Sequence, residues 1–351
     1  MKKIAIEEHF RTEYFINYLK SRTEPPRVDS YEDENKRKIY REWFSADEYT
    51  LWVPEAISKL CDIDEGRLRD MDADGIDMQV LGFPPDLEYL DSSDGTVMAG
   101  KINDELSMAV KKHPDRFAGL AALPLKSPVG AASELERAVK KLGLKGAMIF
   151  PHIDGVYIDA RKYWPIYETA ASLGVPLYLH PTFPPPANQH LYSDYPQLGG
   201  SMWGFAVETG LAAVRLICSG VFDAHPDLKI ILGHLGEALP FWIQRLDTRM
   251  STVVGTLMNV GAPRFTPLTK ILKRLPSYYI RNNFFVTTSG MLVESSLVCC
   301  LMALGADRIL FAVDYPMESN KEALKFLETA KISDTDREKI FHLNAERIFG
   351  L

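Results

Sequence analysis

The sequence predicts an α/β protein of the (β/α)8 TIM-barrel class, and three observations support this fold. Short apolar runs bounded by turn residues recur along the 351-residue chain, and eight of them have the composition of buried strands. Helical patterns fill the intervals between the runs, which is the alternation of a parallel sheet built from βα units. Eight is also the number of parallel strands at which such a sheet closes and leaves no exposed edge. A doubly wound open sheet is the structural alternative.

The eight expected strands follow one another along the whole chain. They are expected at residues 3–8, 77–82, 117–123, 146–150, 176–180, 229–233, 284–288 and 308–313. The run that begins at Ser201 predicts a long amphipathic helix after the fifth strand. His-Pro-Asp occurs at His113 and again at His225, each time between a helix and the next strand, where proline ends the helix. Both histidines are therefore expected at the bottom of the barrel, away from the face that carries barrel active sites.

Residues 1–351 are expected to form one domain, with an insertion at approximately residues 20–60. This connection between the first two strands is long and mixes charged with aromatic residues. Long connections are uncommon in compact domains and are often functional. Two interpretations remain open. The insertion is either a solvated surface excursion or a lid or subunit contact that supplies Arg27, Arg41 or Trp43 to the site.

The composition excludes several classes of protein. With 46% hydrophobic and 25% charged residues, the chain has the composition of a soluble globular protein. A net charge of -7 argues against a nucleic-acid partner. The start, MKKIAIEEHF, lacks the apolar core of a signal peptide, and no window offers about 18 uninterrupted apolar residues for a membrane span. The four cysteines form no CxxC pattern, so we expect a cytoplasmic protein with reduced thiols.

Four residues with metal-ligand chemistry stand at the ends of expected strands. Glu7 and His9 end the first strand, and because side chains alternate along a strand, both are expected on one side with Glu8 on the other. His180 closes the fifth strand and Asp314 closes the eighth. Any one of these residues alone would be interpreted as a hydrogen-bonded core group. Together, two imidazoles and two carboxylates predict one divalent metal, Zn or Mn, with an open coordination position.

A further pair follows the sixth strand. His234 and Glu237 are flanked by glycines that allow the backbone to approach a ligand. His234 is expected to act as a general acid or base, with Glu237 orienting and charging the imidazole. The alternatives are that His234 is another metal ligand and that Glu237 is a first-turn carboxylate favoured by the helix dipole.

Substrate-binding candidates are fewer and rest on weaker signals. Arg245 could face an anionic group of the substrate, although the surrounding sequence is also typical of an exposed helix. Trp203 and Phe205 start the long helix after the fifth strand and could wall an aromatic ligand, although core packing is the simpler interpretation. His152 follows the fourth strand and could line the same pocket.

Seven motifs, in the expected order, carry a resemblance to a known family. They are IAIEEHF, LGLKGAMIF, PLYLHP, GVFDAHPDLKIILGHLGEALPFW, TTSG, DRILFAVDYP and NAERIFGL. Together they resemble the metal-dependent decarboxylases of hydroxylated benzoates in the amidohydrolase superfamily, typified by γ-resorcylate and 2,3-dihydroxybenzoate decarboxylases and related ACMSD-like enzymes. The start Glu-x-His is similar to this branch, whereas many amidohydrolases begin with His-x-His. Carboxyvanillate decarboxylases tend to carry a small residue where this chain has His9, which argues against that substrate.

The resemblance implies a specific activity and a set of site residues. Glu7, His9, His180 and Asp314 would hold the metal, and His234 and Glu237 would assist catalysis. The implied reaction is non-oxidative decarboxylation of an ortho-hydroxylated, dihydroxybenzoate-like acid, with Asp314 also delivering a proton to the ring carbon that loses CO2. The partner would be a small aromatic carboxylic acid, and the enzyme a homodimer or homotetramer. The alternatives are a metal-dependent hydrolase or hydratase of an aromatic ring-cleavage product, and an inactive binding protein on this fold.

Overall fold

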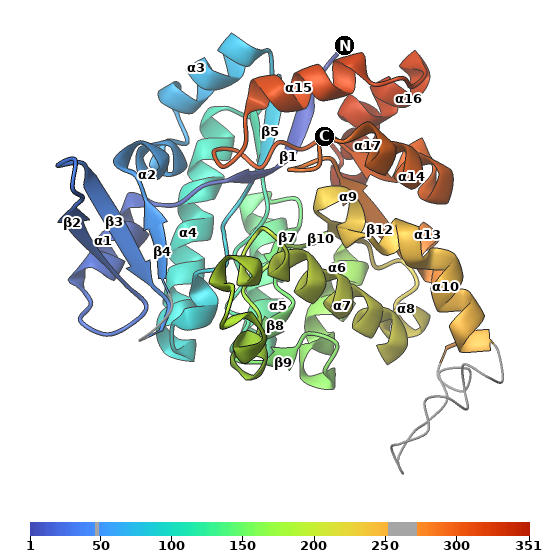
Figure 1. The fold of residues 1–351 in the computed structure, drawn as a ribbon, viewed down its shortest axis with the longest axis horizontal. Coiled ribbons are helices and arrows are strands. Elements are labelled where there is room, and N and C mark those ends of the chain that lie inside the picture. The colour runs from blue at the N-terminus through green and yellow to red at the C-terminus, as the bar shows by residue number, and fades with distance from the viewer. Residues whose placement is uncertain (46–48, 252–271) are drawn as a thin grey trace.

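Eight parallel strands form the wall of a barrel in the computed structural model, which describes residues 1–45, 49–251 and 272–351 (Figure 1). All eight predicted strands are confirmed, each within its expected range or one residue beyond it. They are β1 (Ile4–His9), β5 (Met78–Gly82), β6 (Phe117–Gly119), β7 (Ala147–Ile149), β10 (Leu177–Leu179), β11 (Ile230–Leu232), β12 (Phe284–Thr287) and β13 (Ile309–Leu310).

The strands pair as two parallel sheets that hydrogen bonds join into a ring. The sheet orders are β1-β5-β6 and β13-β12-β11-β10-β7. At one seam Ala121 forms a parallel bridge with Ala147. At the other seam the backbone N–H of Ile6 donates to the carbonyl of Phe311 at 3.0 Å. The structure therefore follows the barrel prediction rather than the open-sheet alternative.

Helices follow the strands and cover the outside of the barrel (Figure 1). They are α1 (Glu13–Ser21), α2 (Pro54–Cys61), α3 (Glu65–Asp74), α4 (Ser92–Lys112), α5 (Pro128–Arg137), α6 (Trp164–Leu173), α7 (Gly204–Ser219), α8 (Val221–Ala224), α9 (His234–Glu237), α10 (Leu239–Ser251), α13 (Pro276–Asn283), α14 (Glu294–Leu304), α15 (Asn320–Thr329), α16 (Asp334–Glu338) and α17 (Asn344–Phe349). Local signals set their limits. The Thr12 side chain accepts the N–H of Phe15 at the start of α1, and Gly75 ends α3 in the left-handed conformation.

The predicted long helix after the fifth strand is α7. It begins at Gly204 and ends before Gly220, whose φ of +80° interrupts the run. With the residues before it, α7 is apolar and long enough to cross a membrane by composition and length alone. Its buried side chains, including Ala212, Leu216 and Ile217, instead belong to the hydrophobic core. We interpret α7 as a core-packed helix of the outer layer.

The insertion after β1 folds as a separate antiparallel sheet. Its strands are β2 (Arg27–Glu32), β3 (Lys38–Trp43) and β4 (Tyr49–Trp52), with β3 in the middle. Figure 1 shows this sheet beside α1 and α2 at one side of the barrel. A second small hairpin, β8 (His152–Ile153) with β9 (Val156–Tyr157), follows β7. The insertion is therefore ordered structure that can contribute to a site.

Candidate metal centre and active-site cavity

Glu7 lies in a bulge of β1. The register between β1 and β5 shifts between Ile6 and Glu8, and Glu7 has a φ of +79°. A bulge inserts an extra residue and interrupts alternation, so the predicted reason for pairing Glu7 with His9 is wrong. The predicted proximity nevertheless holds, because the ligand atoms of Glu7, His9 and His180 all lie within 4.8 Å of one another. Glu8 faces elsewhere, where its carboxylate accepts the N–H of Val313 at 2.9 Å.

All four predicted ligands meet at the carboxyl end of the barrel. Nε2 of His9 lies 2.9 Å from Oδ1 of Asp314, and Nε2 of His180 lies 4.0 Å from Oε1 of Glu7. The rings of His9 and His180 pack edge to face, with centroids 4.8 Å apart. Glu7 and His9 are buried, whereas the side chain of Asp314 is partly accessible.

The free atoms of this cluster fit a divalent cation. Nδ1 of His180 donates to the carbonyl of Pro181 at 2.7 Å, which leaves the Nε2 lone pair available. Burial lowers the pKa of His180 well below its usual value, so the ring is neutral, as a ligand must be. Oε1 of Glu7 is buried and has no hydrogen-bond partner among the described residues. A buried carboxylate oxygen without a partner is costly, and a cation would satisfy it.

His234 and Glu237 form a close pair beside the cluster. Nδ1 of His234 lies 2.7 Å from Oε1 of Glu237, which is almost fully buried. Burial lowers the pKa of His234, but the carboxylates of Glu237, Glu7 and Asp314 outweigh burial and raise it to about 10. Glu237 therefore lies where it can orient and charge this imidazole. Glu237 ends the short element α9, whose backbone is left-handed at Leu235 and Gly236, and α10 begins at Leu239.

Strained backbone marks the same residues. Glu7, His234, Glu237 and Asp314 all have positive φ, with values of 79°, 51°, 51° and 79°. Residues 234–238 form a complete left-handed turn. Each non-glycine residue in this region costs roughly 1–2 kcal/mol, and such strain persists mainly where function requires it. Of the described non-glycine residues with positive φ, only Lys36 and Asp154 lie outside the site and its turn.

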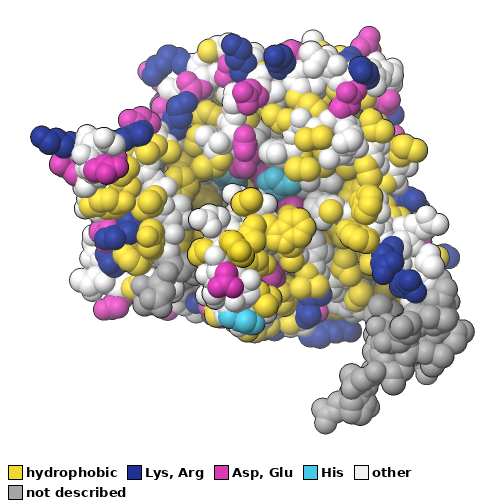
Figure 2. Space-filling view, viewed as in Figure 1, with side chains coloured by type: hydrophobic (Ala, Val, Ile, Leu, Met, Phe, Trp, Pro, Cys, Tyr) yellow, Lys and Arg dark blue, Asp and Glu magenta, His cyan; other side chains and the backbone are white. Residues whose placement is uncertain are grey.

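A cavity of about 450 Å³ opens onto the cluster. Its polar lining includes His9, His180, His234 and Asp314. Its aromatic lining is Phe44, Trp52, Tyr89, Phe183 and Phe205. On the face shown in Figure 2, histidine and acidic side chains lie near the centre with hydrophobic side chains around them. The volume and the mixed lining suit one aromatic ring that carries polar groups.

Two of the three predicted substrate-binding residues lie away from this cavity. Phe205 lines it, but Trp203 is 59% exposed and is absent from its described lining. Arg245 lines a separate groove with Cys218 and Trp242, because α10 turns it toward α7 on the outside of the barrel. We therefore replace Trp203 and Arg245 in the substrate-binding set with residues of the aromatic lining. His152 is also absent from the described lining.

The insertion reaches the cavity through residues that the sequence did not single out. Arg27, Arg41 and Trp43 all donate to Asp29, at 2.7, 3.0 and 2.9 Å, and so form a local polar cluster. The cavity is lined instead by Phe44, Thr50 and Trp52. The sequence analysis selected Trp43 from the insertion, and the residue that lines the cavity, Phe44, is its immediate neighbour in the chain.

Arg11 anchors the insertion to the barrel. Its Nη1 donates to Glu42 of β3 at 2.7 Å, and its Nη2 donates to Asp86, after β5, at 2.9 Å. The indole N–H of Trp52 also donates to Glu42 at 2.7 Å. Arg11, Glu42 and Asp86, called here the Arg11 cluster, are each at most 3% exposed. The sequence contained one cue, because Arg11 lies two residues beyond His9.

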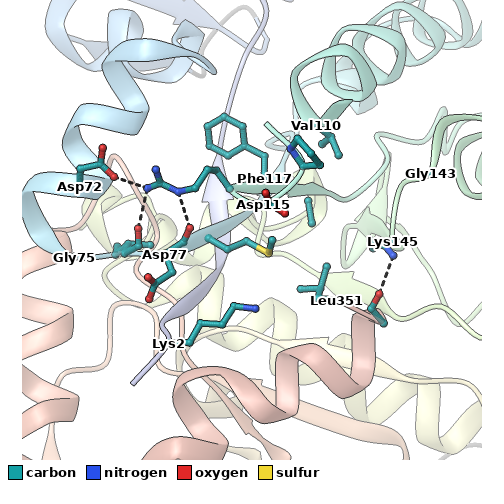
Figure 3. Close-up of a pocket in the computed structure, with 16 residues that line it drawn as sticks. Lys2, Asp72, Gly75, Asp77, Val110, Asp115, Phe117, Gly143, Lys145 and Leu351 are labelled. Atoms are coloured by element: carbon teal, nitrogen blue, oxygen red, sulfur yellow. Dashed lines mark hydrogen bonds and ion pairs between the residues drawn. The ribbon is translucent and has the colours of Figure 1, made fainter. Parts of the chain in front are cut away.

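A larger cavity, of about 920 Å³, lies at the opposite end of the barrel (Figure 3). Most of its lining residues precede or begin β1, β5, β6 and β7, and Gly350 and Leu351 complete it, so it opens at the amino ends of the strands. Its three cations are already paired, Arg116 with Asp72 at 2.7 Å, Lys145 with the carbonyl of Gly350 at 3.0 Å and Lys2 with Glu346 at 2.9 Å. His113 lies 2.7 Å from Asp64 near this end, as predicted for the barrel bottom. We therefore place the active site at the smaller cavity.

The chain is similar to a known family and to proteins of known structure. The family model described as Amidohydrolase matches residues 58–351. The γ-resorcylate decarboxylase of Polaromonas sp. is 37% identical over 357 aligned residues, which cover 99% of this chain and 98% of the relative. A crystal structure of a dihydroxybenzoic acid decarboxylase from Polaromonas sp. JS666, with bound manganese and the inhibitor 2-nitroresorcinol, matches with a TM-score of 0.82 and 36% identity, covering 100% of this chain and 97% of that one.

A second similar structure belongs to an enzyme that is named for a different substrate. The 5-carboxyvanillate decarboxylase of Sphingomonas paucimobilis matches with a TM-score of 0.84 and 33% identity, covering 100% of this chain and 99% of that one. The family model begins at residue 58 and so includes His180, His234 and Asp314 but not β1 or the insertion. The full-length relatives cover those earlier segments of the cavity as well. These three relatives are named decarboxylases, and the chain belongs to the amidohydrolase family.

Proposed function

We propose that this enzyme removes CO2 from an ortho-hydroxylated benzoate of the dihydroxybenzoate type. One observation carries the proposal. His9, His180 and Asp314 line a cavity whose walls suit a single aromatic ring, and Glu7 lies buried beside them with one carboxylate oxygen unpaired. The named decarboxylases among the relatives support the same reaction. They do not favour the alternative, hydrolysis or hydration of a ring-cleavage product.

The ligand set suits a divalent metal with mixed nitrogen and oxygen preference, Zn or Mn. Manganese in the Polaromonas structure supports the second choice. When bound, the metal would supply Lewis-acid chemistry toward an ortho oxygen of the ring and would help to orient the acid. The inhibitor of that relative, 2-nitroresorcinol, has a planar group between two hydroxyls, which is the shape of a 2,6-dihydroxybenzoate.

A proton must reach the ring before or while CO2 leaves. Direct cleavage would leave an aryl carbanion with no place for its charge, whereas an ortho oxygen can donate electron density to the carbon that bears the carboxylate. We assign the proton donor to Asp314, which is partly accessible and lines the cavity. The new C–H bond forms with this proton, the C–C bonding electrons return to the ring, and Asp314 regains a proton from solvent.

His234 and the aromatic walls assist this step. The imidazolium of His234, held by Glu237, stabilises negative charge on the bound acid. Phe183, Phe205 and Trp52 exclude water from the ring, and their apolar surfaces suit the release of uncharged CO2.

The decisive experiment compares Asp314→Asn with Asp154→Asn in Mn- and Zn-loaded protein. Asp154 is a matched control because it also has a positive φ, lies outside the cavity and is exposed. With 2,6-dihydroxybenzoate in D2O, we expect CO2 and a product with one deuterium at the former carboxylate carbon. Asp314→Asn should retain substrate binding and lose at least about a hundredfold in rate, the contribution of a general acid. Normal turnover by Asp314→Asn, at equal metal content, would refute the assignment.

We further propose a cytoplasmic homo-oligomer. Phe241 is 72% exposed on α10 and Met302 is 84% exposed on α14, and both line one apolar groove on the outer surface. Exposed apolar surface of this kind is typical of association sites. The four cysteines are unpaired, which supports a reducing compartment.

A further inference from the structure

The Arg11 cluster contacts the substrate cavity but has no part in the proposed chemistry. Arg11 and Asp86 line the cavity together with Trp52, and Glu42 lies behind them. The guanidinium of Arg11 stands 5.1 Å from the centre of the Trp52 ring. Because Arg11 lies at the cavity wall within a buried ionic group, it is a candidate for distinguishing the substituents of the bound ring.

The charge of this wall disfavours a second anion. Arg11 is the only lysine or arginine in the described lining of the cavity, and it is shared between two carboxylates. Glu42 alone balances its charge. Ionised Asp86 adds a second negative charge, and protonated Asp86 leaves the pair neutral. Burial raises the pKa of Asp86 to about 7 despite the neighbouring guanidinium. A carboxylate placed here would find no free cation to offset its loss of hydration.

The same wall has an unpaired hydrogen-bond donor and an unpaired acceptor, which suit a neutral polar group. Nε of Arg11 and Oδ2 of Asp86 are buried and have no partner among the described residues. One is a donor, and the other accepts when ionised. A hydroxyl both donates and accepts, so it is the smallest group that can pair with a donor and with an acceptor. A phenol of the substrate fits this requirement and a second carboxylate does not.

We propose that the Arg11 cluster is the specificity-determining wall of the cavity, which selects hydroxylated aromatic acids with a single carboxylate and rejects aromatic dicarboxylates. The proposal rests on the proposed function and adds the class of acid that the site accepts. Asp86 has the largest role, because it is the acid of the cluster that lines the cavity, and it carries the unpaired oxygen.

Three matched ligands test this wall on Mn-loaded enzyme. Salicylate is the reference, 2,6-dihydroxybenzoate adds one hydroxyl, and 4-hydroxyisophthalate adds one carboxylate. Dissociation constants from calorimetry, together with kcat and KM where turnover occurs, separate binding from chemistry. Wild-type enzyme should bind the dihydroxy acid most tightly and the dicarboxylate at least about tenfold more weakly than salicylate.

Asp86→Asn should reverse part of this order. It removes an acid while keeping the shape, so binding of 4-hydroxyisophthalate relative to salicylate should improve about tenfold, and the advantage of the second hydroxyl should shrink. Glu42→Gln changes the same charge balance from the insertion side and should shift the dicarboxylate ratio in the same direction. Asp94→Asn, on α4 outside the cavity, should leave all three ratios unchanged. The ratio of two dissociation constants measured on the same preparation does not change when part of the protein is unfolded.

The outcomes separate the two proposals. If wild-type enzyme decarboxylates monoacids and dicarboxylates with equal kcat/KM, the specificity wall is refuted and the proposed function stands. If no acid is decarboxylated, the proposed function fails, and the dissociation constants still test whether the Arg11 cluster selects between monoacids and dicarboxylates. Ratios in Asp86→Asn and Glu42→Gln that equal those of the wild type would overturn the role of the Arg11 cluster.

Discussion

The hydrogen bond at one ring nitrogen decides what the other nitrogen of a histidine can do. His180 uses Nδ1 for a backbone carbonyl and keeps Nε2 free for a cation. His234 uses Nδ1 for Glu237 and presents a charged ring to the cavity. His152 uses both nitrogens, because Nδ1 accepts the N–H of Gly155 at 3.3 Å and Nε2 donates to the carbonyl of Phe183 at 2.9 Å. His152 is therefore a structural residue that holds the loop after β10.

His152 should make the folded state sensitive to acid. Burial lowers its pKa, so the folded protein binds this proton less readily than the unfolded chain. The stabilising contribution is present above the usual pKa of 6.5 and is lost as the pH falls below it. Between about pH 7.5 and 5.5, we expect the free energy of unfolding to fall less for His152→Asn than for wild type. Urea unfolding at both pH values measures this difference.

The matched control for this prediction is His190→Asn, which replaces an exposed histidine on the same face of the barrel. It should show the wild-type pH dependence. An identical loss of stability in wild type and His152→Asn would mean that His152 does not contribute to acid sensitivity.

At the scale of elements, the end of β12 and the loop after it support two site residues at once. Thr287 donates to Oε2 of Glu7 at 3.2 Å, and Ser289 donates to the same oxygen. The backbone N–H of His234 donates to Ser289 at 3.4 Å. A side chain at Gly290 would come within 3.1 Å of the His234 ring, and its φ of +61° also favours glycine. This loop leaves Oε1 as the free oxygen of Glu7.

Ser289 is therefore expected to be a positioning residue for the metal. If the hydroxyl of Ser289 is removed, Glu7 loses one of the two hydrogen-bond donors that hold its carboxylate in place. Ser289→Ala should weaken metal affinity by about 10- to 100-fold, the typical effect of removing an outer hydrogen bond to a ligand. Competition with a calibrated chelator measures this without turnover. Ser295→Ala, at an exposed position of α14, is the control, and equal affinities in the two variants would exclude the positioning role.

The same loop illustrates how far the sequence could predict the elements. Apolar runs located all eight barrel strands, because burial on both faces leaves a strong pattern. Left-handed backbone at Glu7 and Asp314 leaves no such pattern, because neither residue is a glycine. The insertion was recognised by its length, but its strand register depends on partners such as Glu42, which pairs with Arg11 across 31 positions of the chain. The site residues were predictable as strand ends, whereas their supporting contacts were not.

At the scale of the whole molecule, the candidate metal site lies where the barrel closes. Glu7 and His9 belong to the first strand of the ring and Asp314 follows the last, while His180 comes from the middle of the chain. The seam between β1 and β13 also carries the hydrogen bond from Ile6 to Phe311. A cation at this site would therefore join the two ends of the ring, so its binding and global folding should be coupled.

Metal should consequently stabilise the entire fold. At a free concentration of about 100 times its Kd, Mn should add about 2.7 kcal/mol to the free energy of unfolding, because the unfolded chain cannot assemble the four ligands. Urea unfolding with and without a chelator measures the increment, and elemental analysis gives the metal content. His180→Ala should lose both the increment and the stoichiometric metal, whereas His190→Ala, at an exposed position, should keep both. If His180→Ala retains stoichiometric metal and the full increment, the ligands lie elsewhere and the barrel closes without them.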